Sequence, residues 1–254
     1  MFFQADMFAL PSGSFSTIPH DLHRRRRAMF SHHFSTAAVH KLEPLLREKV
    51  DLLLARLEST RETGEPVSLW HAYTALVADI ITAYCFPESY NLLAVPDYSK
   101  QMLETFTRIS LGTHMIKHCP WMIHLLRALP QWLARWVHPD LELLVDMQVG
   151  FANQVLKVKE KRANSNANGD ESEQGHVFDS MLNAEVPESE KSIERLAHEA
   201  QTVVMAGMMT TAHSLMTITY HVLANPHVLV RLIEKLSTMS SGPAEAAPLS
   251  ALEK

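Results

Sequence analysis

The chain has 254 residues, 46% of them hydrophobic and 20% charged, with a formal net charge of −5 at pH 7. That length can bury a sizeable core, and the negative charge excludes a general attraction to nucleic acid, so no nucleic-acid partner is expected. Two cysteines, Cys85 and Cys119, make no disulfide framework and fit a reducing compartment. The chain has no run of about 18 apolar residues and no basic start of a signal peptide. We therefore expect a cytoplasmic or peripheral chain.

Helical spacing of apolar residues begins after an irregular start, residues 1–18, that is rich in serine, proline and glycine. The leucines of "HKLEPLLREKVDLLLARLEST" predict a helix over 40–60, and "VSLWHAYTALVADIITAYCF" predicts a more buried one over 67–86. Two or three helices follow between 98 and 161. The polar, low-complexity stretch 161–176 is predicted to be a flexible loop.

The longest predicted helix follows that loop. Ser192 is a suitable N-cap, and the helical pattern continues to Ala224, about 48 Å at roughly 1.5 Å per residue. Pro226 suits the first turn of a further helix, which ends near Leu236. No stretch is rich in strand signals, so the predicted class is all-α. We expect one domain, with a helical block over 19–160, the loop 161–176, two helices over 192–236 and a loop-like tail over 237–254.

The sequence "AGMMTT", Ala206 to Thr211, interrupts the long helix with poor helix formers. Glycine costs about 1 kcal/mol relative to alanine inside a helix. One interpretation is a close crossing of two helices, with each threonine hydroxyl bonded to a carbonyl one turn back. The other is that Gly207 removes a side chain so that a flat ligand can approach the backbone.

The sequence around this motif resembles the long distal helix and the following helix of a cytochrome P450. It is most similar to the fungal, trichodiene-oxygenase-like branch of that family. The family's helix reads Ala/Gly-Gly-x-Asp/Glu-Thr-Thr/Ser, here "AGMMTT", and its next helix begins at an "ANP", also found here. The resemblance implies a haem cofactor, with Ala206 and Gly207 at the porphyrin face. It also implies that Thr210 is the catalytic residue beside bound dioxygen.

A second block, "HDLHRRRRAMFSHHFS" from His20 to Ser35, resembles the family's helix with Trp/His-x-x-x-Arg. It aligns His23 and Arg27, which lie four residues apart and share a helical face. The resemblance implies that both contact the haem propionates through charge-assisted bonds. The alternative for the arginine run is a solvated basic turn, or a small nucleic-acid or localisation patch.

The sequence also departs from the family. The haem-thiolate loop, Phe-x-x-Gly-x-x-x-Cys-x-Gly, is absent, and the only Glu-x-x-Arg match begins at Glu58, far upstream of its place in the family. We expect the family's N-terminal anchor and sheet to be missing from this chain as well. Met209 stands where the family has an acid before the threonine. The chain is therefore expected to be the central portion of the fold, truncated at both ends and inactive by itself.

Two further groups of residues have both a functional and an ordinary interpretation. His114 and His118 share a helical face, as two ligands of one metal ion would, and Cys119 is next to them. The spacing fixes no third ligand, so no metal site is predicted. Trp121, Trp132 and Trp136 suit peripheral membrane contact or a helical core.

The resemblance implies a haem-dependent monooxygenase of fungal secondary metabolism. Its substrate would be a small lipophilic molecule, a terpenoid or polyketide, and its electrons would come from an NADPH-dependent reductase. A full-length relative would be associated with the endoplasmic reticulum membrane. The alternative is a non-catalytic helical protein that binds a lipid or a partner, or a gene remnant.

Overall fold

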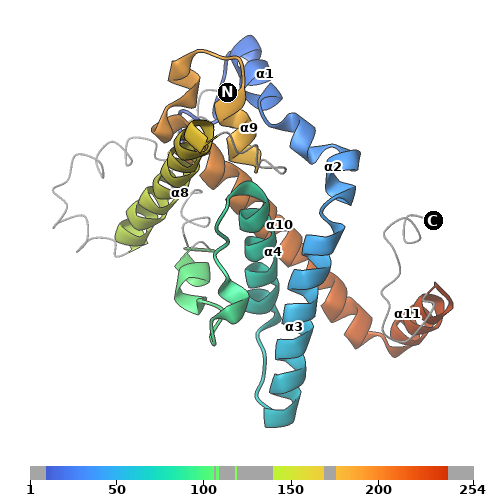
Figure 1. Ribbon diagram of the computed structural model, residues 1–254. Helices are drawn as coiled ribbons and strands as arrows, with labels where there is room; N and C mark the ends of the chain where they lie inside the picture. The colour runs from blue at the N-terminus through green and yellow to red at the C-terminus, as the bar shows by residue number, and fades with distance from the viewer. Residues whose placement is uncertain (1–9, 106, 109–117, 119–139, 169–175, 240–254) are drawn as a thin grey trace.

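The computed structural model describes residues 10–105, 107–108, 118, 140–168 and 176–239 (Figure 1). Within these residues the regular structure is helical and includes no strand, which confirms the predicted all-α class. The α-helices are α1 (His20–Ala28), α2 (Thr36–His40), α3 (Glu43–Thr63), α4 (Leu69–Cys85), α8 (Asp140–Asn168), α9 (Val177–Asn183), α10 (Ile193–Ala224) and α11 (Pro226–Met239). Short 3-10 helices are η2 (Ser31–Phe34), η3 (Leu92–Ala94) and η4 (Glu188–Lys191).

Helix α10 runs through the middle of the described structure, as predicted for a helix of 32 residues (Figure 1). Ser192 caps its N-terminus, since the Ser192 hydroxyl accepts a hydrogen bond from the Arg195 amide. Helices α4 and α8 make its most extensive contacts. The predicted boundaries of α10 and the start of α11 at Pro226 are both confirmed.

The core lies on both sides of the contact between α4 and α10. Small buried residues on α4, among them Ala72, Ala75 and Ala78, let the two helix backbones come close. One apolar cluster joins the end of α4 and the middle of α8 with α9 and the first half of α10, and in it the rings of Phe86 and Phe178 stack 4.7 Å apart. A second cluster joins α3, α4 and η3 to Met208 of α10.

The prediction of a loop over 161–176 is wrong for residues 161–168. Helix α8 continues to Asn168, so residues 161–168 are helical despite their polar, low-complexity sequence. This part of the helix extends a segment whose buried side chains, Phe151, Val155 and Val158, repeat at helical spacing. Packing of that preceding segment favours continued helix, because adding a residue to an existing helix is far easier than starting one.

The second half of α10 and most of α11 expose apolar side chains. The large ones are Ile218, Tyr220, Leu223, Val228, Val230, Leu232, Ile233 and Leu236. None of the described helices is long and apolar enough to cross a membrane. An apolar surface of this extent on a helix pair is typical of a face that packs against further protein or another apolar surface.

Candidate functional site

The central strip of α10 carries Ala206 and Thr210, which lie one helical turn apart and are both exposed. The Thr210 hydroxyl donates a hydrogen bond of 2.8 Å to the carbonyl oxygen of Ala206. One turn further, the Ser214 hydroxyl donates to the carbonyl oxygen of Thr210 over 2.9 Å. The strip therefore presents small side chains whose hydroxyls are held against the helix, and a flat ligand can approach it closely.

Gly207 faces a different direction. It follows Ala206 by one residue, which turns it about 100° around the helix axis. A Cβ atom added at Gly207 would lie 3.7 Å from Cγ1 of Ile81 in α4. Met209 is half-buried against the second apolar cluster. The structure thus brings Ala206 and Thr210 together on an exposed face of α10 and places Gly207 at the crossing with α4.

The other predicted contacts, His23 and Arg27, lie on α1, which has no buried residue of its own. His23 is half-buried and Arg27 is exposed, and the side chain of Arg27 makes no hydrogen bond or ion pair with another described residue. Arg24 and Arg25 are exposed as well. This end of α1 is therefore a positively charged surface that suits carboxylate groups.

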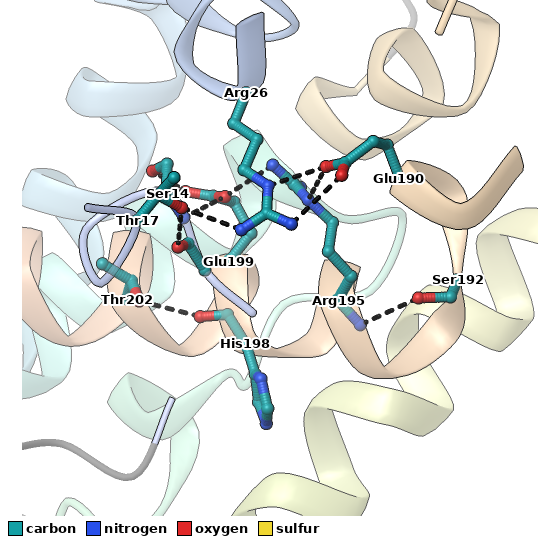
Figure 2. A network of polar contacts seen from close by, with 10 residues as sticks. Ser14, Thr17, Arg26, Glu190, Ser192, Arg195, His198, Glu199 and Thr202 are labelled. Atoms are coloured by element: carbon teal, nitrogen blue, oxygen red, sulfur yellow. Dashed lines mark hydrogen bonds and ion pairs between the residues drawn. The ribbon is translucent and has the colours of Figure 1, made fainter. Parts of the chain in front are cut away.

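One arginine of the same run points inward instead. The Arg26 guanidinium binds the Glu190 carboxylate, which also lies 3.4 Å from Arg195 of α10 (Figure 2). Sequence analysis did not single out the pair of Arg26 and Glu190, because the two residues are 164 positions apart in the chain. The one available signal was the spacing of Arg195 and Glu199, an i,i+4 charge pair on a largely apolar helix.

Neither cysteine is placed as an iron ligand by the described residues. Cys85 is fully buried in the core, and burial raises the pKa of its thiol, which disfavours the thiolate needed to bind a metal. Cys119 lies outside the described residues, as do His114, Trp121, Trp132 and Trp136. Glu58 and Arg61, the Glu-x-x-Arg match, form an exposed ion pair of 2.9 Å on α3.

Comparison with known proteins decides the family. The family model described as Cytochrome P450 matches residues 3–253. The chain belongs to the cytochrome P450 family. The match extends over nearly the whole chain, and it confirms the resemblance drawn from "AGMMTT", "ANP" and the arginine-rich block.

Curated cytochrome P450 relatives come from fungi. Tryptophan 6-hydroxylase fscE of Fusarium equiseti is 36% identical over 250 residues, which are 98% of this chain and 48% of the relative. N-acetyltryptophan 6-hydroxylase ivoC of Emericella nidulans is 32% identical over 228 residues, 90% of this chain and 44% of the relative. Cytochrome P450 monooxygenase TRI4 of Fusarium sporotrichioides is 27% identical over 250 residues, 97% of this chain and 46% of the relative. The chain spans about half the length of these relatives.

Haem is the cofactor of cytochrome P450 proteins, and two features of the structure fit it. The strip of Ala206 and Thr210 is exposed and carries only small side chains, which suits the close approach of a flat porphyrin to α10. The exposed arginine surface of α1, with Arg27 in it, is the donor type that binds propionate carboxylates. The axial ligand is the part of a P450 haem site for which the described residues offer no candidate.

Proposed function

We propose that the protein carrying this chain is a haem-dependent monooxygenase of fungal secondary metabolism. The observation that carries the proposal is the exposed Ala206–Thr210 strip on a central helix of a cytochrome P450 chain. When bound, haem supplies the iron at which dioxygen is reduced with electrons from an NADPH-dependent reductase, and one oxygen atom is transferred to the substrate.

The residues of this chain would contribute in three ways. Arg27 and His23 would hold the propionates by charge-assisted hydrogen bonds and so fix the cofactor's orientation. Ala206 would let the porphyrin approach the helix, because a methyl group is the only side-chain bulk there. The Thr210 hydroxyl would exchange its bond with the Ala206 carbonyl for one to an incoming water molecule and would hold or pass on a proton there.

The proposed substrate is a small lipophilic molecule, of the terpenoid or polyketide kind that the resemblance implies. The names of two relatives add tryptophan and N-acetyltryptophan as compounds to test. A peripheral association with the endoplasmic reticulum membrane is proposed with it. The polypeptide of these 254 residues alone is expected to lack turnover, because neither of its cysteines stands in a haem-thiolate loop.

Uptake of haem by the purified protein tests the proposal, followed as Soret absorbance during a titration. We expect saturation at one haem per chain, and an affinity about tenfold lower or more for Arg27→Gln, the loss typical of a hydrogen bond to a charged group. Arg25→Gln removes the same charge from the same helix and should leave the affinity within about twofold of wild type. Equal losses in the two variants would show only a general charge effect and would contradict the assigned role of Arg27.

The alternative function, a non-catalytic helical protein that binds a lipid or a partner, is favoured by one feature. This feature is the exposed apolar surface of α10 and α11, which includes Ile218, Leu223 and Ile233. Flotation with lipid vesicles separates the two functions. Vesicle binding that Ile233→Asp abolishes, in a protein that takes up no haem, would favour the alternative.

A further inference from the structure

Helix α1 carries the two proposed propionate contacts, yet none of its own residues is buried. Just beyond its end, Met29 is buried in the first apolar cluster. One anchor at the end of a nine-residue helix leaves the helix free to rotate and tilt about that point. Something else must therefore fix the direction in which His23 and Arg27 face.

Arg26 supplies a second anchor. Its Nε donates to Oε2 of Glu190 over 2.7 Å, and its Nη2 donates to Oε1 over 3.1 Å, so both carboxylate oxygens are bound (Figure 2). Its Nη1 donates to the Thr17 hydroxyl over 2.8 Å. The side chains of Arg26 and Glu190 are only 13% and 17% exposed. A two-point contact of this kind restricts orientation as well as distance.

The network continues into α10. Nη2 of Arg195 lies 3.0 Å from Oε2 of Glu199, and Glu199 also accepts a hydrogen bond of 2.9 Å from the backbone amide of Ser14. Arg195 is 2% exposed and Glu199 is fully buried. Two arginines thus alternate with two glutamates, so the buried charges sum to zero, which is the condition under which such burial is tolerated. The bonds from Arg26 lower the pKa of Glu190, which keeps that carboxylate charged.

The position of Arg26 on α1 determines where its neighbours point. Successive residues of a helix are turned by about 100°, and residues four apart by about 40°. With Arg26 directed at Glu190, the side chain of Arg27 leaves the helix about 100° away, and His23 shares the face of Arg27. Rotation of α1 is therefore coupled to the bond between Arg26 and Glu190.

We propose that Arg26 and Glu190 are a positioning pair that fixes the rotation of α1 against α10 and thereby aims His23 and Arg27 at the haem propionates. The aiming of His23 and Arg27 at the propionates rests on the proposed haem function. The fixed rotation of α1 rests on the contacts of Arg26 and Glu190 alone. Neither residue is proposed to touch the cofactor.

The experiment measures two quantities in the same variants. The first is hydrogen exchange at the backbone amides of α1 in the haem-free protein, with the amides of α4 as an internal reference. The second is haem affinity by Soret titration. The variants are Arg26→Gln, Glu190→Gln and the double change, with Arg26→Lys as the conservative substitution and Arg25→Gln as the matched control.

We expect Arg26→Gln and Glu190→Gln each to speed exchange in α1 by about tenfold or more, with exchange in α4 unchanged. Both should weaken haem binding, and the double variant should be no worse than the more affected single one, because the two residues act as one contact. Arg26→Lys keeps the charge but not the two-point contact, and should give intermediate values of both quantities. Arg25→Gln should change neither.

Wild-type exchange rates in the α1 amides of Arg26→Gln would overturn the inference, as would a rise that is equal in α1 and α4. Faster exchange in α1 with unchanged haem affinity would also overturn it, provided that Arg27→Gln still weakens haem binding. The proposed haem function, and not the positioning pair, fails if exchange in α1 becomes faster in Arg26→Gln while neither Arg27→Gln nor Arg26→Gln changes haem affinity.

Discussion

The hydroxyl of Thr210 is bonded to the carbonyl oxygen of Ala206, one turn back on the same exposed face of α10. A threonine that satisfies its hydroxyl in this way contributes little to the packing of the fold. The same bond is easily exchanged, because both residues are open to an incoming ligand. This pairing makes Thr210 a residue whose loss should affect function far more than stability.

Thr210→Ala is therefore expected to change the free energy of unfolding by no more than about 0.5 kcal/mol. In a full-length protein that carries this chain, loaded with haem and supplied with its reductase, product formed per NADPH consumed should fall about tenfold or more, because a proton donor is lost. Thr211→Ala is the matched control, since Thr211 is also exposed but faces about 100° away. A similar loss of product in both variants would contradict the role given to Thr210.

Gly207 should tolerate one added methyl group. A Cβ at this position would make ordinary van der Waals contact with Ile81 at 3.7 Å, and alanine is the better helix former. We expect Gly207→Ala to raise the free energy of unfolding by about 0.5–1 kcal/mol in thermal or urea unfolding. Gly207→Leu should lower it by about 1–3 kcal/mol, because the larger side chain meets α4. A strong destabilisation by Gly207→Ala would show that the two helices are closer than the structure indicates.

Arg56 is expected to hold the segment after α4. Its guanidinium donates to the carbonyl oxygens of Leu93, Val95 and Pro96 and lies 3.9 Å from the ring centroid of Tyr98. Arg56→Gln should lower the free energy of unfolding by about 1.5–3 kcal/mol, since these bonds involve a charged donor.

Chemical denaturation compares Arg56→Gln with Arg61→Gln. Arg61 lies on the same helix, and its side chain forms an exposed ion pair with Glu58. Arg61→Gln should lower the free energy of unfolding by less than about 1 kcal/mol. Equal costs for the two arginines would refute the special role of Arg56.

The positioning pair predicts a dependence of stability on acid pH. The Arg26 hydrogen bond lowers the pKa of Glu190 below its ordinary value of 4.5. A lowered pKa in the folded state means that the contribution of Glu190 to stability is complete above about pH 4.5. That contribution is lost as the pH falls through the folded-state value. Denaturation at several pH values should show Glu190→Gln with a weaker loss of stability than wild type below pH 4.5, and parallel curves would contradict this.

Much of the fold could be predicted because local signals agreed with packing. Ser192 and Pro226 mark real helix starts, and the motif "AGMMTT" with "ANP" led to the correct family. The end of α8 could not be predicted, because residues 161–168 have a loop-like composition and follow a helix anchored by Phe151 and Val155. Local composition says nothing about that anchoring.

The candidate site was predicted only in part, for a related reason. Spacing identified Ala206 and Thr210 as one face, but it could not reveal that Ile81 lies against Gly207. The arginine run suggested Arg27 by alignment. Nothing in the run distinguishes Arg26, whose partner Glu190 is 164 residues away and is found only in the folded chain.

The central claim is that haem binds against the exposed face of Ala206 and Thr210, and haem titration of wild type and Ala206→Leu tests it most directly. Leucine at this exposed helical position should leave the free energy of unfolding within about 0.5 kcal/mol of wild type. The account predicts that wild type binds one haem per chain and that Ala206→Leu binds it at least about tenfold more weakly. Thr211→Leu, on another exposed face of the helix, should bind haem as wild type does. Equal haem affinity in wild type and Ala206→Leu, or no haem uptake by wild type, would contradict the account.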